Sequence, residues 1–109
     1  MALIDEGEVD WKIIGVNAES PLAKLISKPD DIETVMPGLE TTIREWFRMY
    51  KTTDGKPMNT FGYDEKILPK TNALQIIDET HTSWKRLVNG DIPSAGLNLT
   101  LAKPSEKKN

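Results

Sequence analysis

The sequence has no cysteine and only one histidine, His81. Disulfides and thiolate metal sites are therefore excluded. A cysteine nucleophile is excluded as well, and only one histidine is present to act as a base for another nucleophile. No apolar run approaches the ~20 residues that a membrane-spanning helix needs. The N-terminus also lacks the basic region followed by an apolar one that marks a signal peptide. Together these absences predict a cytoplasmic protein with no membrane segment.

Several chemical signatures are missing as well. The glycine-rich phosphate loops G-x-x-x-x-G-K-S/T and G-x-G-x-x-G do not occur, and neither do G-x-S-x-G or H-E-x-x-H. The net charge of −3 does not favour nucleic acid as a partner. What remains is ordinary for a folded domain: 109 residues, 38% hydrophobic and 28% charged. A chain of this size buries roughly two thirds of its unfolded surface.

Two segments have the apolar periodicity of amphipathic helices. The first, residues 37–51, carries an apolar stripe of Leu39, Ile43, Trp46, Phe47 and Tyr50. The second, residues 71–88, carries another of Leu74, Ile77, His81, Trp84 and Val88. Pro37 can serve as the first residue of the first helix, and Asn89-Gly90 can end the second. We expect both stripes, including Trp46 and Trp84, to face a core.

The strand signals are scattered. An apolar, β-branched and aromatic run predicts a buried strand at 9–16. Short strands are predicted around Phe61 and Tyr63 and along the alternating leucines of 97–101. Between them, Asp30 and Glu33 have the spacing of a capping box on a short helical turn. The predicted class is α+β with an incomplete sheet. The polar segment 103–109 is expected to be a disordered tail, which leaves 1–102 as the folded part.

An acidic cluster precedes the predicted strand: Asp5, Glu6, Glu8 and Asp10. Asp10 and Lys12, two apart on a strand, point to the same face. Gly7 permits a tight turn that would bring Asp5 towards Asp10. Carboxylates that converge beside a lysine suit a hard cation such as Mg²⁺, with the ammonium free for an anionic oxygen. The alternative interpretation is a solvated acidic turn.

A second candidate lies at the end of the first helix, in the segment REWFRMYK. Tyr50 and Lys51 place a phenol next to an ammonium, and both can donate hydrogen bonds to phosphate oxygens. The alternative is a plain amphipathic helix end, in which Arg48 and Lys51 are cations favoured by the helix dipole.

Three blocks can now be matched as a set: ALIDEGEVDWKIIGV, PGLETTIREWFRMYKTTDGKP and IIDETHTSWKRLV. In order and spacing they resemble the later half of the soluble, eukaryotic-type (family I) inorganic pyrophosphatases. The resemblance implies an OB-like, five-stranded barrel with flanking helices, in which 9–16 is one strand. It also implies Mg²⁺-dependent hydrolysis of diphosphate to two phosphates by a metal-activated water. By the same resemblance, Asp5 and Asp10 are metal ligands, whereas Lys12, Tyr50 and Lys51 bind phosphate.

The sequence also departs from the family. The family's acidic D-x-D-P-x-D block, which supplies further carboxylates and the proposed base, is absent, so no catalytic residue is assigned. We therefore expect a C-terminal portion of the enzyme with a partial barrel, inactive by itself. Its expected partner is the missing N-terminal half or another copy in a homo-oligomer. Two alternatives stay open: a non-catalytic truncated isoform that acts by association, and an acidic metal-binding domain unrelated to diphosphate.

Overall fold

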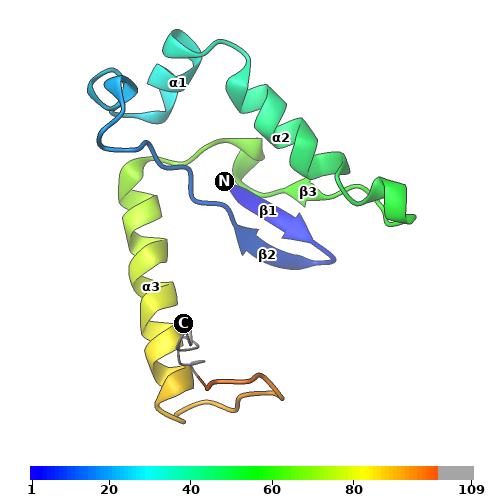
Figure 1. Ribbon diagram of the computed structural model, residues 1–109. Coiled ribbons are helices and arrows are strands. Elements are labelled where there is room, and N and C mark those ends of the chain that lie inside the picture. The colour runs from blue at the N-terminus through cyan, green and yellow to red at the C-terminus, as the bar shows by residue number, and fades with distance from the viewer. Residues whose placement is uncertain (101–109) are drawn as a thin grey trace, which may run out of the picture. The chain divides into compact units, whose positions relative to one another are not determined.

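The computed structural model describes residues 1–100, which form two compact units (Figure 1). The first unit comprises residues 1–76 and the second begins at residue 77. Within 1–100, no helix combines the length and the apolar character that crossing a bilayer requires.

The first unit is built on a three-stranded antiparallel sheet in the order β2-β1-β3. The strands are β1 (Ala2–Asp5), β2 (Glu8–Trp11) and β3 (Thr60–Phe61). β1 and β2 form a hairpin with a two-residue turn at Glu6 and Gly7. Both turn residues have positive φ, 51° and 81°, as a type I′ turn requires. The predicted tight turn at Gly7 is therefore confirmed.

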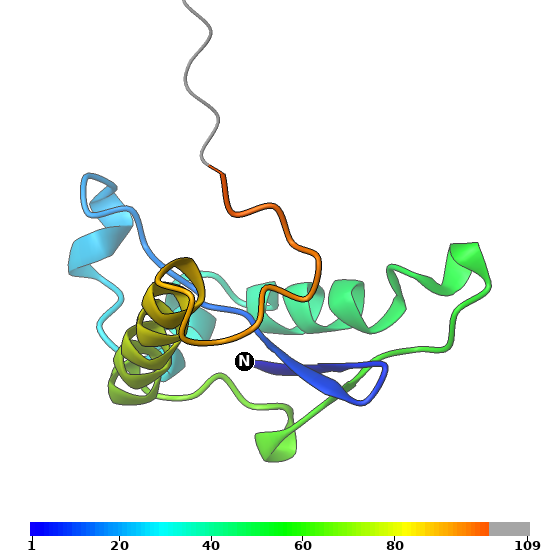
Figure 2. The ribbon, with the colours of Figure 1, turned by 90° about the horizontal axis from the view of Figure 1, so that it is seen from below.

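Helices complete the described chain. In the first unit, α1 (Pro29–Val35) precedes α2 (Leu39–Met49), which lies along one face of the sheet (Figures 1 and 2). α3 (Lys70–Val88) runs on into the second unit. Three short 3-10 turns lie between these elements: η1 (Pro21–Lys24), η2 (Thr52–Asp54) and η3 (Tyr63–Glu65). The end of α3 confirms the predicted stop, because Gly90 takes a φ of 82° and the Asp91 N–H bonds the Arg86 carbonyl at 2.9 Å.

The buried core of the described residues is small. Its members are Met1, Ala2, Leu3 and Ile32, together with one polar residue, Asn59. Leu3, at the centre of the sheet, is fully buried. Trp46 and Trp84 are 60% and 53% exposed, so the prediction that their stripes face a core is wrong for both tryptophans. A periodic stripe is buried only where another element lies against it, and periodicity cannot say whether one does.

The strands differ from the predictions in position and length. The predicted 9–16 strand ends at Trp11, and the chain leaves the sheet as it continues towards Val16. Tyr63 lies in η3 with a φ of 54°, outside the strand region. Residues 97–100 form no strand, and Leu101 lies outside the described residues, as does the predicted tail. The α+β class holds, but residues 1–100 form an open sheet and not a closed barrel.

Helix starts were also predicted imperfectly. α2 begins at Leu39 after Gly38, whose φ of 83° separates Pro37 from the helix. At the start of α1, the carboxylate of Asp31, rather than the predicted Asp30–Glu33 pair, accepts backbone hydrogen bonds from Ser27 and Lys28, at 2.9 and 3.2 Å. These bonds hold the pKa of Asp31 below its usual value.

Candidate active site at the β-hairpin and the end of α2

The hairpin register puts the predicted ligands on one face of the sheet. Asp5 pairs with Glu8, and Leu3 pairs with Asp10, so Asp10 is the diagonal neighbour of Asp5. Paired residues share a face, and alternate residues on one strand share it too. Lys12 continues this face, because its backbone exchanges two hydrogen bonds with Met1, at 2.9 and 3.0 Å. The sheet therefore presents Asp5, Asp10 and Lys12 together.

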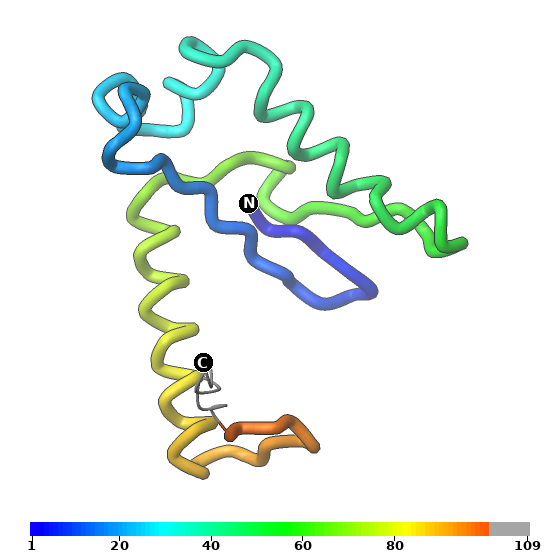
Figure 3. The backbone as a smooth tube through the Cα atoms, in the orientation of Figure 1, coloured from blue at the N-terminus to red at the C-terminus, as the bar shows by residue number. Residues whose placement is uncertain are grey.

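The end of α2 faces the same side of the sheet. The Lys51 ammonium forms an ion pair with the Asp5 carboxylate, and the Tyr50 hydroxyl donates to the same carboxylate at 3.5 Å. In the backbone trace of Figure 3, the hairpin and the end of α2 lie side by side in space. Residues 45 positions apart in the sequence thus meet at one carboxylate. The structure brings Asp5, Tyr50 and Lys51 into direct contact.

A second carboxylate–ammonium pair lies beside the first. Lys12 Nζ is 3.1 Å from Asp10 Oδ2 and 5.2 Å from the ring centre of Phe47, on α2. The predicted shared face of Asp10 and Lys12 is confirmed. Each predicted metal ligand therefore contacts a predicted phosphate ligand: Asp5 contacts Lys51, and Asp10 contacts Lys12.

The Asp5–Lys51 pair is the more sheltered of the two. Its side chains are 24% and 12% exposed, against 44% and 31% for Asp10 and Lys12. The hydrogen bond from Lys51 lowers the pKa of Asp5, and the same bond raises the pKa of Lys51. Both groups are charged at neutral pH.

Arg48, one turn before Lys51, is turned away from this cluster. Its guanidinium bonds Glu45 at 3.0 Å and Glu65 of η3 at 2.5 Å, and it lies 5.2 Å from the ring centre of Phe61. The hydrogen bonds that Arg48 donates to Glu45 and Glu65 raise the pKa of Arg48, and the same guanidinium lowers the pKa of Glu45. Arg48 thus ties α2 to η3 and leaves Tyr50 and Lys51 as the groups of this helix end that face Asp5.

Asn59 is the residue at this site that sequence reasoning missed. Only 4% exposed, it donates from Nδ2 to the Phe47 carbonyl and from its backbone N–H to the Arg48 carbonyl, each at 2.9 Å. Both carbonyls belong to the last turn of α2. In the sequence Asn59 is one polar residue in a loop, and its only signal is that it directly precedes the short strand at Phe61.

Asp5 and Asp10 suit a metal ion that has further ligands from outside this chain, and not one that the chain encloses by itself. Within residues 1–100, no group of three or more His, Cys, Asp or Glu side chains converges as a complete ligand set. Mg²⁺, however, is commonly held by one or two carboxylates, with waters and substrate phosphates completing its shell. Asp5 and Asp10 are oxygen donors of that kind, next to cationic groups suited to phosphate.

Comparison with known proteins identifies the family of this chain. The profile of the family described as "Inorganic pyrophosphatase" matches residues 1–85. The chain belongs to this family. Among its relatives, soluble inorganic pyrophosphatase 6, chloroplastic, of Arabidopsis thaliana is 46% identical over 91% of this chain. The inorganic pyrophosphatase of Zygosaccharomyces bailii is 46% identical over 92% of the chain.

Solved structures of the family share the fold. A recombinant inorganic pyrophosphatase from T. brucei brucei superposes with a TM-score of 0.79 and 33% identity, over 83% of this chain and 26% of its own. The Schistosoma japonicum enzyme superposes with a TM-score of 0.76 and 40% identity, over 79% of this chain and 30% of its own. The chain spans about a third of the length of the curated relatives, 33% and 35% for the two named above.

Proposed function

We propose that the chain supplies part of the active site of a Mg²⁺-dependent inorganic pyrophosphatase, which hydrolyses diphosphate to two phosphates. The observation that carries the proposal is the contact of Asp5 with both Tyr50 and Lys51, across two elements far apart in the sequence. Family membership supports it independently. Because the relatives are about three times as long, the activity belongs to a larger assembly than residues 1–100.

In this proposal, Asp5 and Asp10 hold the cation, and Lys12, Tyr50 and Lys51 bind and orient phosphate oxygens. Bound Mg²⁺ supplies charge neutralisation and a water of lowered pKa. Phosphoryl transfer asks the protein mainly for positioning and electrostatic stabilisation, and these five side chains can provide both. The two lysines and the phenol donate charge-assisted or strong hydrogen bonds to phosphate.

Residues 1–100 provide two of the carboxylates that the resemblance calls for, and the D-x-D-P-x-D block is not in the sequence. We therefore propose that residues 1–109 are inactive alone and act together with a protein segment that carries this block. A homo-oligomeric partner could only repeat the same incomplete set of side chains. The relatives' names include chloroplastic and mitochondrial forms; for this chain the cytoplasm is our proposal.

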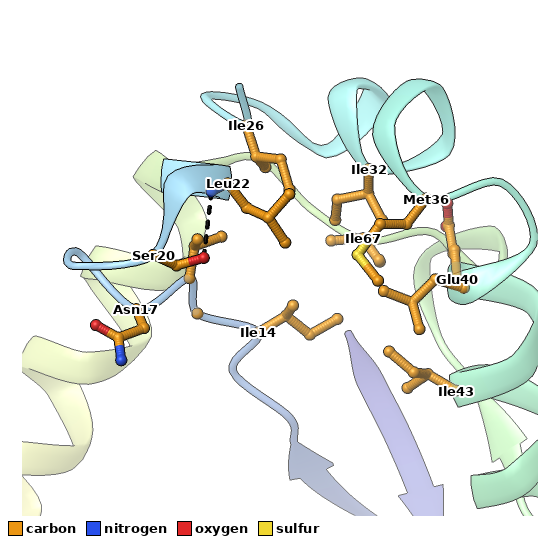
Figure 4. A pocket seen from close by; sticks show the side chains of 13 residues that line it. Ile14, Asn17, Ser20, Leu22, Ile26, Ile32, Met36, Glu40, Ile43 and Ile67 are labelled. Carbon is orange, nitrogen blue, oxygen red and sulfur yellow. Dashed lines mark hydrogen bonds between the residues drawn. The ribbon is translucent and has the colours of Figure 1, made fainter. Parts of the chain in front are cut away.

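We propose that an apolar cavity is part of the surface that contacts this partner. It has a volume of about 210 Å³ and lies between the segment after β2 and helices α1 and α2 (Figure 4). Ile14, Ile32 and Ile43 point into it from these three segments (Figure 4). Nearby, Ile13 and Val16 are 46% and 40% exposed. Apolar surface of this kind favours association.

The test is hydrolysis of diphosphate with Mg²⁺, by the chain alone and mixed with the part of the Z. bailii enzyme that this chain does not match. We expect activity only in the mixture, and a loss of at least about 100-fold with Asp5→Asn, because a metal ligand is removed. Glu8→Gln is the control, since Glu8 pairs with Asp5 in the register but is exposed at the hairpin end. Equal losses for both variants would contradict the role of Asp5.

The mixture also separates the alternatives. If the two polypeptides associate without any hydrolysis, the chain is a non-catalytic binding partner, a function that the apolar cavity by itself would support. An acidic metal-binding domain unrelated to diphosphate predicts a different result. In that case Mg²⁺ binding would be lost with Asp10→Asn and retained with Lys51→Ala, and phosphate would not bind at all.

A further inference from the structure

The last turn of α2 depends on one buried polar side chain. The final carbonyls of a helix have no partners within the helix and must find them elsewhere. α2 ends at Met49, so the carbonyls of Phe47 and Arg48 belong to this group. Asn59 satisfies both, one with its side-chain amide and one with its backbone N–H.

Asn59 also connects this helix end to the sheet. It directly precedes β3, in which Thr60 pairs with Ile4 and Phe61 pairs with Leu3 of β1. The chain that leaves α2 returns beside it to reach this position (Figure 3). Asp5 follows Ile4 on β1. Asn59 therefore joins, through two short links, the helix end that carries Lys51 and the strand that carries Asp5.

Because Asn59 is buried, its side-chain amide needs a hydrogen-bond partner within the protein. At 4% exposure, its amide has no free access to water, and a buried donor without a partner is costly. The orientation of the amide is thus set by the helix carbonyl.

We infer that Asn59 is a positioning residue for the proposed reaction: it fixes the last turn of α2 so that Tyr50 and Lys51 face Asp5. The inference rests on the proposed function for the roles of Tyr50 and Lys51. Asn59 bonds the carbonyls of Phe47 and Arg48, and in the proposed reaction it does not contact phosphate. It acts through the helix end.

The first test uses Asn59→Asp, which keeps the size of the side chain and replaces its amide donor with an oxygen. Side-chain NMR of the full chain measures the proximity of Lys51 and Tyr50 to Asp5. We expect these cross-peaks to weaken or vanish, while those between Lys12 and Asp10, which are two positions apart in the sequence, persist. Ile32→Ala is the control, because Ile32 is buried in α1 and makes no bond to the end of α2. Persistent Lys51–Asp5 cross-peaks in Asn59→Asp would overturn the inference.

Asn59→Ser covers the possibility that Asn59→Asp does not fold. It leaves the backbone N–H bond to Arg48 and removes only the amide donor to Phe47. Retained folding with loss of the Lys51–Asp5 contact supports positioning. If both variants unfold, Asn59 serves the fold as a whole, and the inference is wrong.

The second test is a double-mutant cycle on phosphate binding, with inorganic phosphate and Mg²⁺ as the probe. Asn59→Ser should weaken phosphate binding about fivefold, the worth of roughly one hydrogen bond. The same change in a background with both Tyr50→Phe and Lys51→Met should have almost no further effect, because the two groups that Asn59 positions are already gone. Additive losses would overturn the inference. If the unaltered chain binds no phosphate even when mixed with the part of the Z. bailii enzyme that it does not match, the proposed function fails, while the NMR result still decides the role of Asn59.

Discussion

Removing a lysine from this site should strengthen the binding of a divalent cation. Lys51 and Lys12 occupy the carboxylates of Asp5 and Asp10. A cation that binds these carboxylates must first displace the ammonium groups, which then become free for phosphate. Lys51→Met removes the competitor of Asp5, so we expect tighter cation binding and weaker phosphate binding.

The size of the effect follows from the exposure of each pair. An ion pair near the surface is worth a factor of about two to five in an equilibrium constant. The Asp5–Lys51 pair, 24% and 12% exposed, should lie at the upper end of this range for cation affinity, and Asp10–Lys12, 44% and 31% exposed, nearer the lower end. Lys56 pairs with Glu6 at 3.3 Å, with side chains 52% and 61% exposed, and supplies the control.

Calorimetric titration of each variant with Mn²⁺, and then with inorganic phosphate in the presence of the cation, measures both changes. The expected order of gain in cation affinity is Lys51→Met, then Lys12→Met, with Lys56→Met close to the unaltered chain. Phosphate affinity should fall in the first two variants only. The reasoning is refuted if Lys51→Met leaves cation binding unchanged or weaker, or if Lys56→Met matches it.

Three further predictions concern the fold. The Asp5–Lys51 pair should stabilise the chain between the usual Asp and Lys pKa values, 3.8 and 10.5. Its contribution is lost as the pH falls through the lowered pKa of Asp5 or rises through the raised pKa of Lys51, and thermal unfolding of Asp5→Asn should lack this dependence. Leu3→Ala should cost about 3 kcal/mol of unfolding free energy in urea, because Leu3 is fully buried; Val9→Ala, at a 53% exposed position, should cost far less. Gly7→Ala should lower the free energy of unfolding by about 1 kcal/mol, because an alanine is strained at a φ of 81°. No clash adds to this loss, since a Cβ at this position meets nothing within 4 Å. An unchanged free energy of unfolding would contradict the turn geometry.

Much of the helical structure could be predicted from the sequence, because helices are local. The stripe from Leu39 to Tyr50 predicts α2 to within two residues at each end, and Asn89-Gly90 marks the end of α3. The sheet was harder. β1 is four residues long and its pairing with β3 joins Leu3 to Phe61, a separation that no local pattern encodes. Burial was harder still, since Trp46 satisfies the helical pattern and remains exposed.

In the candidate site, too, local features could be predicted from the sequence and long-range contacts could not. The tight turn at Gly7 and the shared face of Asp10 and Lys12 follow from chain geometry and were predicted. The meeting of Asp5 with Lys51 depends on how α2 packs on the sheet, and the sequence suggested it only through the family resemblance. Asn59 could not be predicted, because its partners are backbone carbonyls, which carry no sequence signature. The roles of these residues in binding metal and phosphate stay predictions.

The chemistry of the site depends on the pairing register of β1 and β2. Side chains alternate between the faces of a strand, so a slip of this pairing by one residue would send Asp10 and Lys12 to the far side and bring Val9 and Trp11 towards α2. The short turn at Glu6 and Gly7 holds the register, because turn type and loop length set the pairing of a hairpin. A longer connection would keep both aspartates facing α2 only if its extra residues stayed in the loop and left Asp5 opposite Glu8.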